Sequence, residues 1–220
     1  LAPVTVEAPG DSRICTEIVD ARNGKVTQLH GAGVCADADA GRRLADAVER
    51  ACEGAQWLAL CGSLAEGLPV ETYAALIQRA HARGIRVALD TSGEALSAGW
   101  RAAPEILRVN AHEARETGLD PDLRQLDAAT LSIVSDGAGE IAVHAADYVF
   151  RIRPPRVRAR NPIGCGDAML AGLLSRIDAC GIADALRFAT ALASADAEAE
   201  CAGRPDLKRA RALETKVVIR

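Results

Sequence analysis

Short apolar runs alternate with stretches of helical periodicity along most of the chain. The runs predict buried strands at residues 57–61, 85–89, 106–109, 131–135, 141–144 and 148–153. Apolar residues at helical spacing predict helices near residues 39–51, 70–80, 111–117, 166–180 and 182–200. This alternation is typical of an α/β domain in which helices cover a mostly parallel central sheet.

A pair of alternating segments precedes this pattern. Residues 13–19 and 25–30 flank a polar stretch that contains Asn23-Gly24, which is a strong signal for the turn of a β-hairpin. We therefore predict a small two-stranded flap over residues 11–31. No repeat, linker or low-complexity segment divides the chain, so residues 1–220 are interpreted as one domain.

The composition narrows the class of protein. Of the 220 residues, 49% are apolar and 25% are charged, as in a globular domain with a real core. No apolar run approaches the roughly 20 residues that a membrane-spanning helix needs. The net charge of −4 and the supply of only two Trp, two Tyr and two Phe argue against nucleic acid as a partner. A small molecule is the favoured ligand.

The cysteines and the first residues indicate the compartment. The seven cysteines form no C-x-x-C pair and the four histidines no H-x-x-x-H pair, so neither a zinc site nor a disulfide framework is predicted. The chain opens at Leu1 without Met and without the pattern of a signal peptide. We expect a cytoplasmic protein, of which this chain is a fragment or a processed form.

The most informative stretch is residues 161–172, where Gly164, Cys165, Gly166 and Asp167 open an amphipathic helix. Glycines let the backbone approach a ligand, and the unpaired amides of a first helical turn, with the helix dipole behind them, stabilise an anion. Asp167 is placed to take a proton from an attacking hydroxyl. The motif therefore indicates phosphoryl transfer, although an ordinary helix start with an acidic residue also fits the pattern.

This motif and four further segments, in their order along the chain, resemble the ribokinase-like sugar kinases. That family's usual signature is Gly-Ala-Gly-Asp or Gly-Ser-Gly-Asp, and Asn161-Pro162 is similar to the branch with 1-phosphofructokinase and tagatose-6-phosphate kinase. The further segments are residues 10–14, 62–69, 90–93 and 110–113. Each is weak alone, but the ordered set is specific.

The resemblance implies a fold and an activity. The fold is the ribokinase-like three-layer α/β arrangement, with helices on both faces of a mostly parallel sheet and the flap as a lid. The activity is ATP-dependent phosphorylation of a sugar phosphate, fructose 1-phosphate or tagatose 6-phosphate, with Mg²⁺. Asp167 is then the catalytic base, and the amides of Gly164, Cys165 and Gly166 form the anion hole.

Several residues are implied to bind the nucleotide and the metal. Asn110 and Glu113 match the family's Asn-x-x-Glu, associated with phosphate and, indirectly through Glu113, with Mg²⁺. The alternative is a helix cap made by the same two side chains. The remaining nucleotide-binding candidates are the turn residues Ser135, Gly137 and Gly139 and the helix residue Asp196, which stands where the family usually has Asn.

The sugar phosphate has its own candidates. Arg13 resembles an arginine that reaches the phosphate of the sugar, and a guanidinium suits a phosphate dianion. Ser63 and Asp90 follow predicted strands and are expected at the crevice where open α/β sheets bind ligands. The lid is also a candidate surface for a homodimer.

The chain departs from the family's pattern in two places. Members are typically near 300 residues, and an N-terminal third with strands and a Gly-Gly-x-x-x-Asn motif is implied to precede residue 1. The segment 118–131 is shorter than its counterpart in the family. Three alternatives stay open: a ribokinase-like kinase for another sugar or a nucleoside, a non-catalytic nucleotide-binding or interaction protein derived from a sugar kinase, and thiol chemistry at Cys165, whose helix N-terminus lowers a thiol pKa in general.

Overall fold

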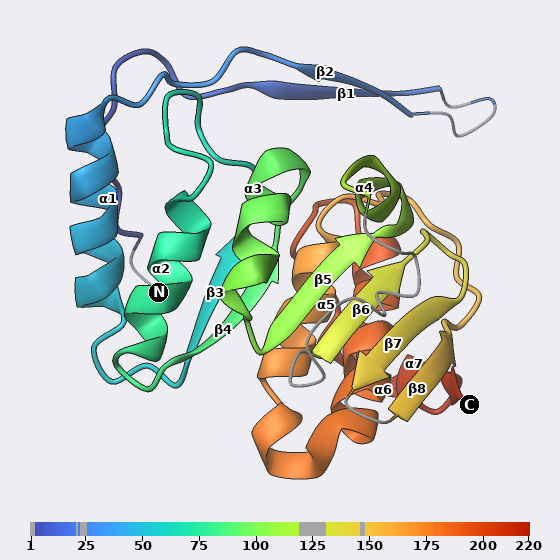
Figure 1. Cartoon of the computed structure of the whole chain (residues 1–220). Helices are drawn as coiled ribbons and strands as arrows, with labels where there is room; N and C mark the ends of the chain where they lie inside the picture. Colours follow the sequence, from blue (N-terminus) through green and yellow to red (C-terminus); the bar gives the residue numbers. More distant parts are fainter. Residues whose placement is uncertain (1–2, 21, 23–25, 119–130, 146–147) are drawn as a thin grey trace.

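The main sheet of the protein is open and mixed (Figure 1). The computed structural model describes all residues except 1–2, 21, 23–25, 119–130 and 146–147. Among the described residues, seven strands pair in chain order: β3 (Trp57–Cys61), β4 (Arg86–Asp90), β5 (Ile106–Asn110), β6 (Leu131–Ser135), β7 (Ile141–Ala145), β8 (Tyr148–Arg153) and β9 (Val218–Ile219). Strands β3 to β6 are parallel, whereas β7, β8 and β9 each run antiparallel to their neighbours.

All six predicted strands are present, and β9 is the addition. Its two residues pair with Ile152 and Arg153 of β8. A two-residue strand has no periodicity of its own, so its pairing depends on the tertiary structure. The helices are α1 (Ala38–Ala51), α2 (Thr72–His81), α3 (Gly93–Gly99), a 3₁₀ turn at Trp100–Ala102, α4 (Ala111–Glu116), α5 (Cys165–Leu174), α6 (Ile177–Ala197) and α7 (Leu207–Glu214).

In the last part of the chain, the structure corrects two sequence predictions. The helix predicted over 166–180 ends at Leu174, and α6 begins at Ile177 and contains a non-helical Gly181 with φ of 79°. A further helix, α7, follows, in which only Ala210 and Leu213 are buried. Such a narrow apolar face in a charged segment gives little helical periodicity. The helix α3 was not predicted either, because its seven residues are too few to show helical periodicity.

Helices cover both faces of the sheet. On one face, α5, α6 and α7 bury a core that includes Ile133, Leu173 and Ala189. On the other, α2 and α3 pack over β3 to β6 around Leu89 and Leu96. Figure 1 shows these two layers on opposite sides of the strands. No helix in the part of the chain that the structure describes is long and apolar enough to cross a membrane.

The predicted flap is confirmed as a separate two-stranded sheet of β1 (Cys15–Val19) and β2 (Val26–His30). The Asn23-Gly24 turn lies outside the described residues. In Figure 1 the hairpin lies across the top of the molecule, above the edge at which β3 to β6 end. The amide of Ala36 donates to the carbonyl of Glu66 at 2.7 Å, which ties the chain after the hairpin to the loop after β3.

Candidate active site

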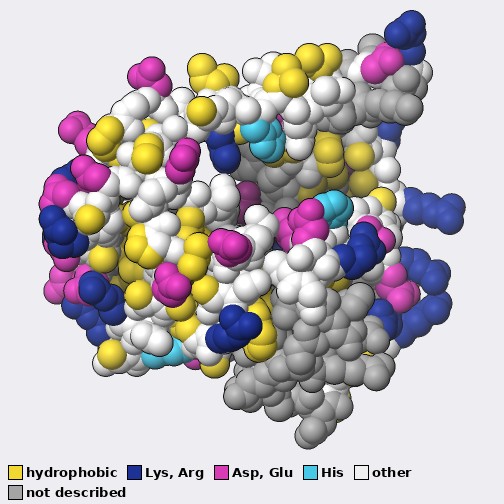
Figure 2. Space-filling view, turned by 45° about the horizontal axis from the view of Figure 1, so that its top comes forward, with side chains coloured by type: hydrophobic (Ala, Val, Ile, Leu, Met, Phe, Trp, Pro, Cys, Tyr) yellow, Lys and Arg dark blue, Asp and Glu magenta, His cyan; other side chains and the backbone are white. Residues whose placement is uncertain are grey.

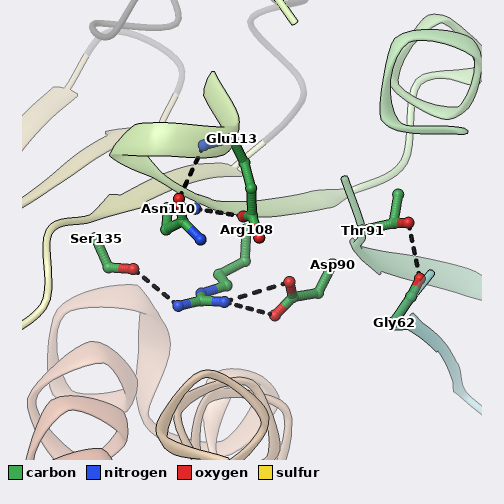
Figure 3. A network of polar contacts seen from close by, with 7 residues as sticks. All are labelled: Gly62, Asp90, Thr91, Arg108, Asn110, Glu113 and Ser135. Atoms are coloured by element: carbon green, nitrogen blue, oxygen red, sulfur yellow. Dashed lines mark hydrogen bonds and ion pairs between the residues drawn. The ribbon is translucent and has the colours of Figure 1, made fainter. Parts of the chain in front are cut away.

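The carboxyl ends of the parallel strands bring polar residues together. Asp90 ends β4, Asn110 ends β5 and Ser135 ends β6. Because parallel strands end at one edge of a sheet, these residues lie near one another, as Figure 3 shows. Asp90 and Ser135 are buried. Asp90, which the sequence analysis expected at this edge of the sheet, therefore lies in a polar cluster with Asn110 and Ser135.

Asn110 and Glu113 form a capping box at the start of α4. The side-chain oxygen of Asn110 accepts from the amides of His112 (2.9 Å) and Glu113 (2.8 Å), and the Glu113 carboxylate accepts from the Asn110 amide (2.8 Å). The cap that was the alternative interpretation is thus present. It occupies both lone pairs of the Asn110 oxygen, so only the Asn110 side-chain NH₂ remains for a ligand.

The glycine loop opens α5 as expected. Gly164 is the residue before the helix and adopts a left-handed φ of 79°, which favours glycine. A Cβ at Gly164 would also lie 3.0 Å from the amide nitrogen of Gly203. Asp167 stands exposed in the first turn of the helix. The loop and Asp167 therefore have the arrangement that the sequence predicted.

An arginine that the sequence analysis did not single out connects these parts. Arg108, in the middle of β5, donates from Nη1 to Asp90 Oδ2 at 3.1 Å and from Nη2 to Ser135 Oγ at 2.8 Å (Figure 3). Its side chain is 15% exposed. The available signal was a charged residue at the centre of an otherwise apolar strand, since such residues are rarely buried without a partner.

A cavity of about 830 Å³ lies beside this cluster. Its polar wall includes Arg108, Asn110, Ser135 and Gly137, and the glycine loop contributes Gly166 along with Cys165. The lining also includes an apolar wall of Ile141, Pro154, Pro155, Val157, Met169, Ala193 and Ala197, with the polar residues Arg156, Thr190 and Ser194 among them. A cavity of this size that combines apolar surface with polar groups is typical of small-molecule sites.

Two nucleotide candidates lie differently from expectation. Asp196 is fully buried and does not line the cavity; its Oδ2 accepts from the Gly203 amide at 3.3 Å. Ala193 and Ala197, four residues apart, share the helix face that lines the cavity, and Asp196 lies on another face. Gly139 is likewise outside the lining, where its amide closes a turn by donating to the Asp136 carbonyl at 2.7 Å.

The sugar-phosphate candidates are distributed over the lid and the strand ends. Asp90 belongs to the Arg108 cluster, whereas Arg13 and Ser63 are exposed and do not line the cavity. The Cβ of Arg13 is 3.9 Å from the position that a Cβ on Gly33 would occupy, so Arg13 lies at the base of the hairpin. Figure 2 shows that the molecule is hollowed below the hairpin.

The thiol of Cys165 is poorly suited to nucleophilic chemistry. Burial raises its pKa to about 11, and the nearby Asp196 charge acts in the same direction. A thiol with this pKa is protonated at neutral pH, and the thiolate is the reactive form. The position of Cys165 at a helix N-terminus does not overcome these effects.

Asp90 provides a pH-dependent contribution to stability. Burial raises the pKa of its carboxyl to about 6, although the Arg108 charge acts to lower it. Folding therefore takes up a proton between about pH 4 and pH 6, and this contribution to stability is lost as the pH rises through 6.

We expect the free energy of unfolding to fall between pH 4.5 and pH 7 by about 1–3 kcal/mol more in the parent than in Asp90→Asn, which has no carboxyl to titrate. Urea denaturation at the two pH values measures the difference. Parallel changes in the parent and the variant would show that Asp90 does not titrate in this range.

The fold and the site define a class: a ribokinase-like α/β protein with a glycine loop at the carboxyl edge of its sheet. The model of the pfkB family carbohydrate kinases matches residues 5–208, and the chain belongs to this family. It is 36% identical over 197 residues to a 1-phosphofructokinase of Rhodobacter capsulatus, covering 83% of this chain and 62% of that protein.

Two further proteins are similar over nearly the whole chain. A 1-phosphofructokinase of Xanthomonas campestris is 31% identical over 227 residues, which cover 96% of this chain and 71% of that protein. The crystal structure of a possible 1-phosphofructokinase from Thermotoga maritima superposes with a TM-score of 0.82 at 18% identity, covering 96% of this chain and 71% of that one. The chain thus spans roughly two thirds of the length of these proteins.

Proposed function

We propose that this chain carries the catalytic site for ATP-dependent phosphorylation of fructose 1-phosphate. The observation that carries the proposal is Asp167 in the first turn of α5, directly after the loop residues Cys165 and Gly166 that line the cavity. The relatives from Rhodobacter capsulatus and Xanthomonas campestris are both named 1-phosphofructokinase. Tagatose 6-phosphate is the alternative acceptor.

The proposed roles follow from position and chemistry. Asp167 takes the proton from the attacking sugar hydroxyl. The amides of Gly164, Cys165 and Gly166, at the positive end of α5, stabilise the charge on the transferring phosphoryl group. Transfer of this kind depends mostly on positioning and electrostatics, because the protein forms no covalent bond to the phosphoryl group.

The cavity is proposed to hold ATP. Its cationic lining residues are Arg108, Arg115 and Arg156, against the single carboxylate of Asp136. This excess of positive charge suits a polyphosphate, and the apolar wall with Met169 suits the purine. Ser135 and Gly137, in the turn after β6, belong to the polar wall and offer further polar contacts.

Mg²⁺ fits only as a metal carried with the nucleotide. Within the described residues no group of three or more His, Cys, Asp or Glu is close enough to hold a metal ion. Mg²⁺ commonly keeps several waters and binds through one carboxylate together with substrate phosphates. Glu113, which points toward the Asp90–Arg108 pair in Figure 3, is the residue that would hold it through water. The metal would neutralise charge on the phosphates.

The sugar phosphate is proposed to bind between the hairpin and the strand ends. Arg13 supplies a guanidinium for the existing phosphate of the sugar, and Ser63 and Asp90 contact its hydroxyls. None of the three lines the nucleotide cavity.

The experiment that tests the function measures ADP release by the chain with MgATP and, in turn, fructose 1-phosphate, tagatose 6-phosphate or free fructose. The expected result is the highest kcat/KM with fructose 1-phosphate and the lowest with fructose. Binding of ATP without transfer to any acceptor would instead indicate a non-catalytic nucleotide-binding protein. Absence of ATP binding would contradict both interpretations.

A cytoplasmic location is proposed from the thiols. All seven cysteines are free, and five of them are exposed: Cys15, Cys35, Cys61, Cys180 and Cys201. Free exposed thiols persist most readily in a reducing compartment.

A homodimer through the lid is proposed from one face of the hairpin. Ile14, Ile18 and Leu29 are 76%, 53% and 54% exposed, and the strand register places Ile18 and Leu29 on the same face. Figure 2 shows apolar side chains along the hairpin. The opposite face carries a polar pair, in which Gln28 donates to Glu17 at 3.0 Å. An exposed apolar face of this kind is typical of an interaction surface.

Ile18→Asp is expected to convert the dimer to a monomer, because it places a charge in the apolar face. Glu17→Lys, on the polar face of the same strand, is the control and is expected to remain dimeric. Light scattering after size-exclusion chromatography measures both masses. A monomeric parent chain would contradict the lid dimer, and so would a dimeric Ile18→Asp.

A further inference from the structure

The hydroxyl of Tyr73 contacts the chain at the point where β3 ends. Tyr73 lies in the first turn of α2, and its side chain is buried. Its Oη donates toward two carbonyl oxygens, that of Gly62 at 3.1 Å and that of Cys61 at 3.2 Å. Burial raises the pKa of this hydroxyl above its ordinary value, so the hydroxyl keeps its proton and acts as the donor. Tyr73 therefore binds the backbone from which the loop with Ser63 begins.

A second buried hydroxyl binds the same carbonyl. Thr91 directly follows β4, and its Oγ1 donates to the carbonyl oxygen of Gly62 at 2.8 Å, as Figure 3 shows. The amide of Gly62 donates to the carbonyl of Asp90 at 2.9 Å. A carbonyl oxygen has two lone pairs, and the hydroxyls of Tyr73 and Thr91 account for both. Every polar backbone group of Gly62 is thus bonded.

The conformation of Gly62 depends on these hydrogen bonds. Its φ is 86°, and no atom lies within 4 Å of the position that a Cβ would occupy. A glycine in open space has many accessible conformations, because it has no side chain that neighbouring atoms could restrain. The hydrogen bonds, rather than side-chain packing, therefore select the observed conformation.

The orientation of Gly62 in turn determines the direction of Ser63. The peptide that joins them is trans, so the amide of Ser63 points opposite to the carbonyl of Gly62 and away from the two hydroxyls. Ser63 is exposed, and within the described residues neither its amide nor its hydroxyl forms a hydrogen bond. The direction in which Ser63 meets a ligand therefore depends on the bonds that Gly62 makes.

We propose that Tyr73 is a positioning residue for the sugar phosphate, which together with Thr91 fixes the peptide between Gly62 and Ser63. This assignment rests on the proposed kinase function, in which Ser63 contacts the sugar, and adds a residue that itself touches no substrate. If α2 needed only an aromatic ring at this position, phenylalanine would fill the space without a buried hydroxyl to satisfy. The hydroxyl therefore has its role at the loop rather than in packing.

The test compares the steady-state kinetics of the parent chain, Tyr73→Phe and Thr91→Val, with fructose 1-phosphate and MgATP varied in turn. Each substitution nearly preserves the shape of the side chain and removes one donor. Each is expected to raise KM for fructose 1-phosphate by about 3–10-fold, the usual effect of one neutral hydrogen bond, and to leave KM for ATP within about twofold of the parent. The double variant is expected to exceed the product of the two single effects, because either bond alone still holds the carbonyl.

Ser175→Ala is the matched control. Its hydroxyl also donates to a backbone carbonyl, that of Gly172 at 2.8 Å, but at the opposite end of α5 from the glycine loop. The control is expected to lower the melting temperature as the other single variants do and to leave both KM values unchanged. If Tyr73→Phe fails to fold by circular dichroism, Thr91→Val tests the same carbonyl in its place.

The outcomes separate this assignment from the proposed function. A parent chain that transfers phosphate to no sugar would overturn the proposed function, and the assignment of Tyr73 with it. An active parent whose Tyr73 and Thr91 variants lose only thermal stability, or lose affinity for ATP and the sugar equally, would show that Tyr73 is structural. A rise in KM that is confined to fructose 1-phosphate, and that Ser175→Ala does not share, supports Tyr73 as the positioning residue.

Discussion

Asp167→Asn is expected to lower kcat for phosphoryl transfer by about two to four decades, the usual contribution of a positioned general base. The side chain is exposed in the first turn of α5, so the amide variant is expected to fold and to bind ATP as the parent does. Initial rates with ATP and fructose 1-phosphate give kcat, and calorimetry gives the affinity for ATP.

Cys165→Ser is the neighbouring control. The proposed role of Cys165 is its backbone amide, which serine retains, and its thiol, with a pKa of about 11, is not ionised at neutral pH. The variant is therefore expected to keep kcat within about tenfold of the parent. An inactive Cys165→Ser beside an active Asp167→Asn would contradict the kinase mechanism and favour thiol chemistry.

Gly67→Ala is expected to lower the free energy of unfolding by about 2–4 kcal/mol, from backbone strain and overlap together. Gly67 has a φ of 86°, and a Cβ there would overlap the carbonyl oxygen of Ala36. For a chain of this size the melting temperature is expected to fall by about 5–10 °C. The same overlap would disturb the Ala36–Glu66 hydrogen bond, which ties the chain after the hairpin to the loop after β3.

Gly54→Ala separates strain from overlap. Gly54 has a similar φ of 72°, but no atom lies within 4 Å of the Cβ that alanine would add. Its expected cost is the strain alone, about 1 kcal/mol, or roughly 2–4 °C in melting temperature. Differential scanning calorimetry compares the two variants. Equal decreases in melting temperature would show that the backbone at Ala36 moves to accommodate the added methyl group without a loss of stability.

Local pattern was sufficient for most of the secondary structure. The apolar runs of β3 to β8 and the alternating segments of the hairpin carry their signals within a few residues, and the structure confirms these strands and the pairing of β1 with β2. The glycine loop was also predicted from the sequence, because Gly164 directly precedes the helix α5 and Asp167 lies in the first turn of that helix. The break between α5 and α6 was not predicted, because the apolar residues Leu173, Leu174 and Ile177 keep helical spacing across the polar residues Ser175 and Arg176.

The sequence by itself determined the α/β class, the hairpin and the motif at Asp167, because each depends on residues that are neighbours along the chain. Only the tertiary structure decided that Asp196 turns away from the cavity and that Arg108 lies under Gly166. Arg108 and Gly166 are far apart in sequence, and no local pattern encodes a contact of that kind. Their contact exists because the fold brings the guanidinium of Arg108, on β5, against the first turn of α5, and this contact makes glycine necessary at position 166.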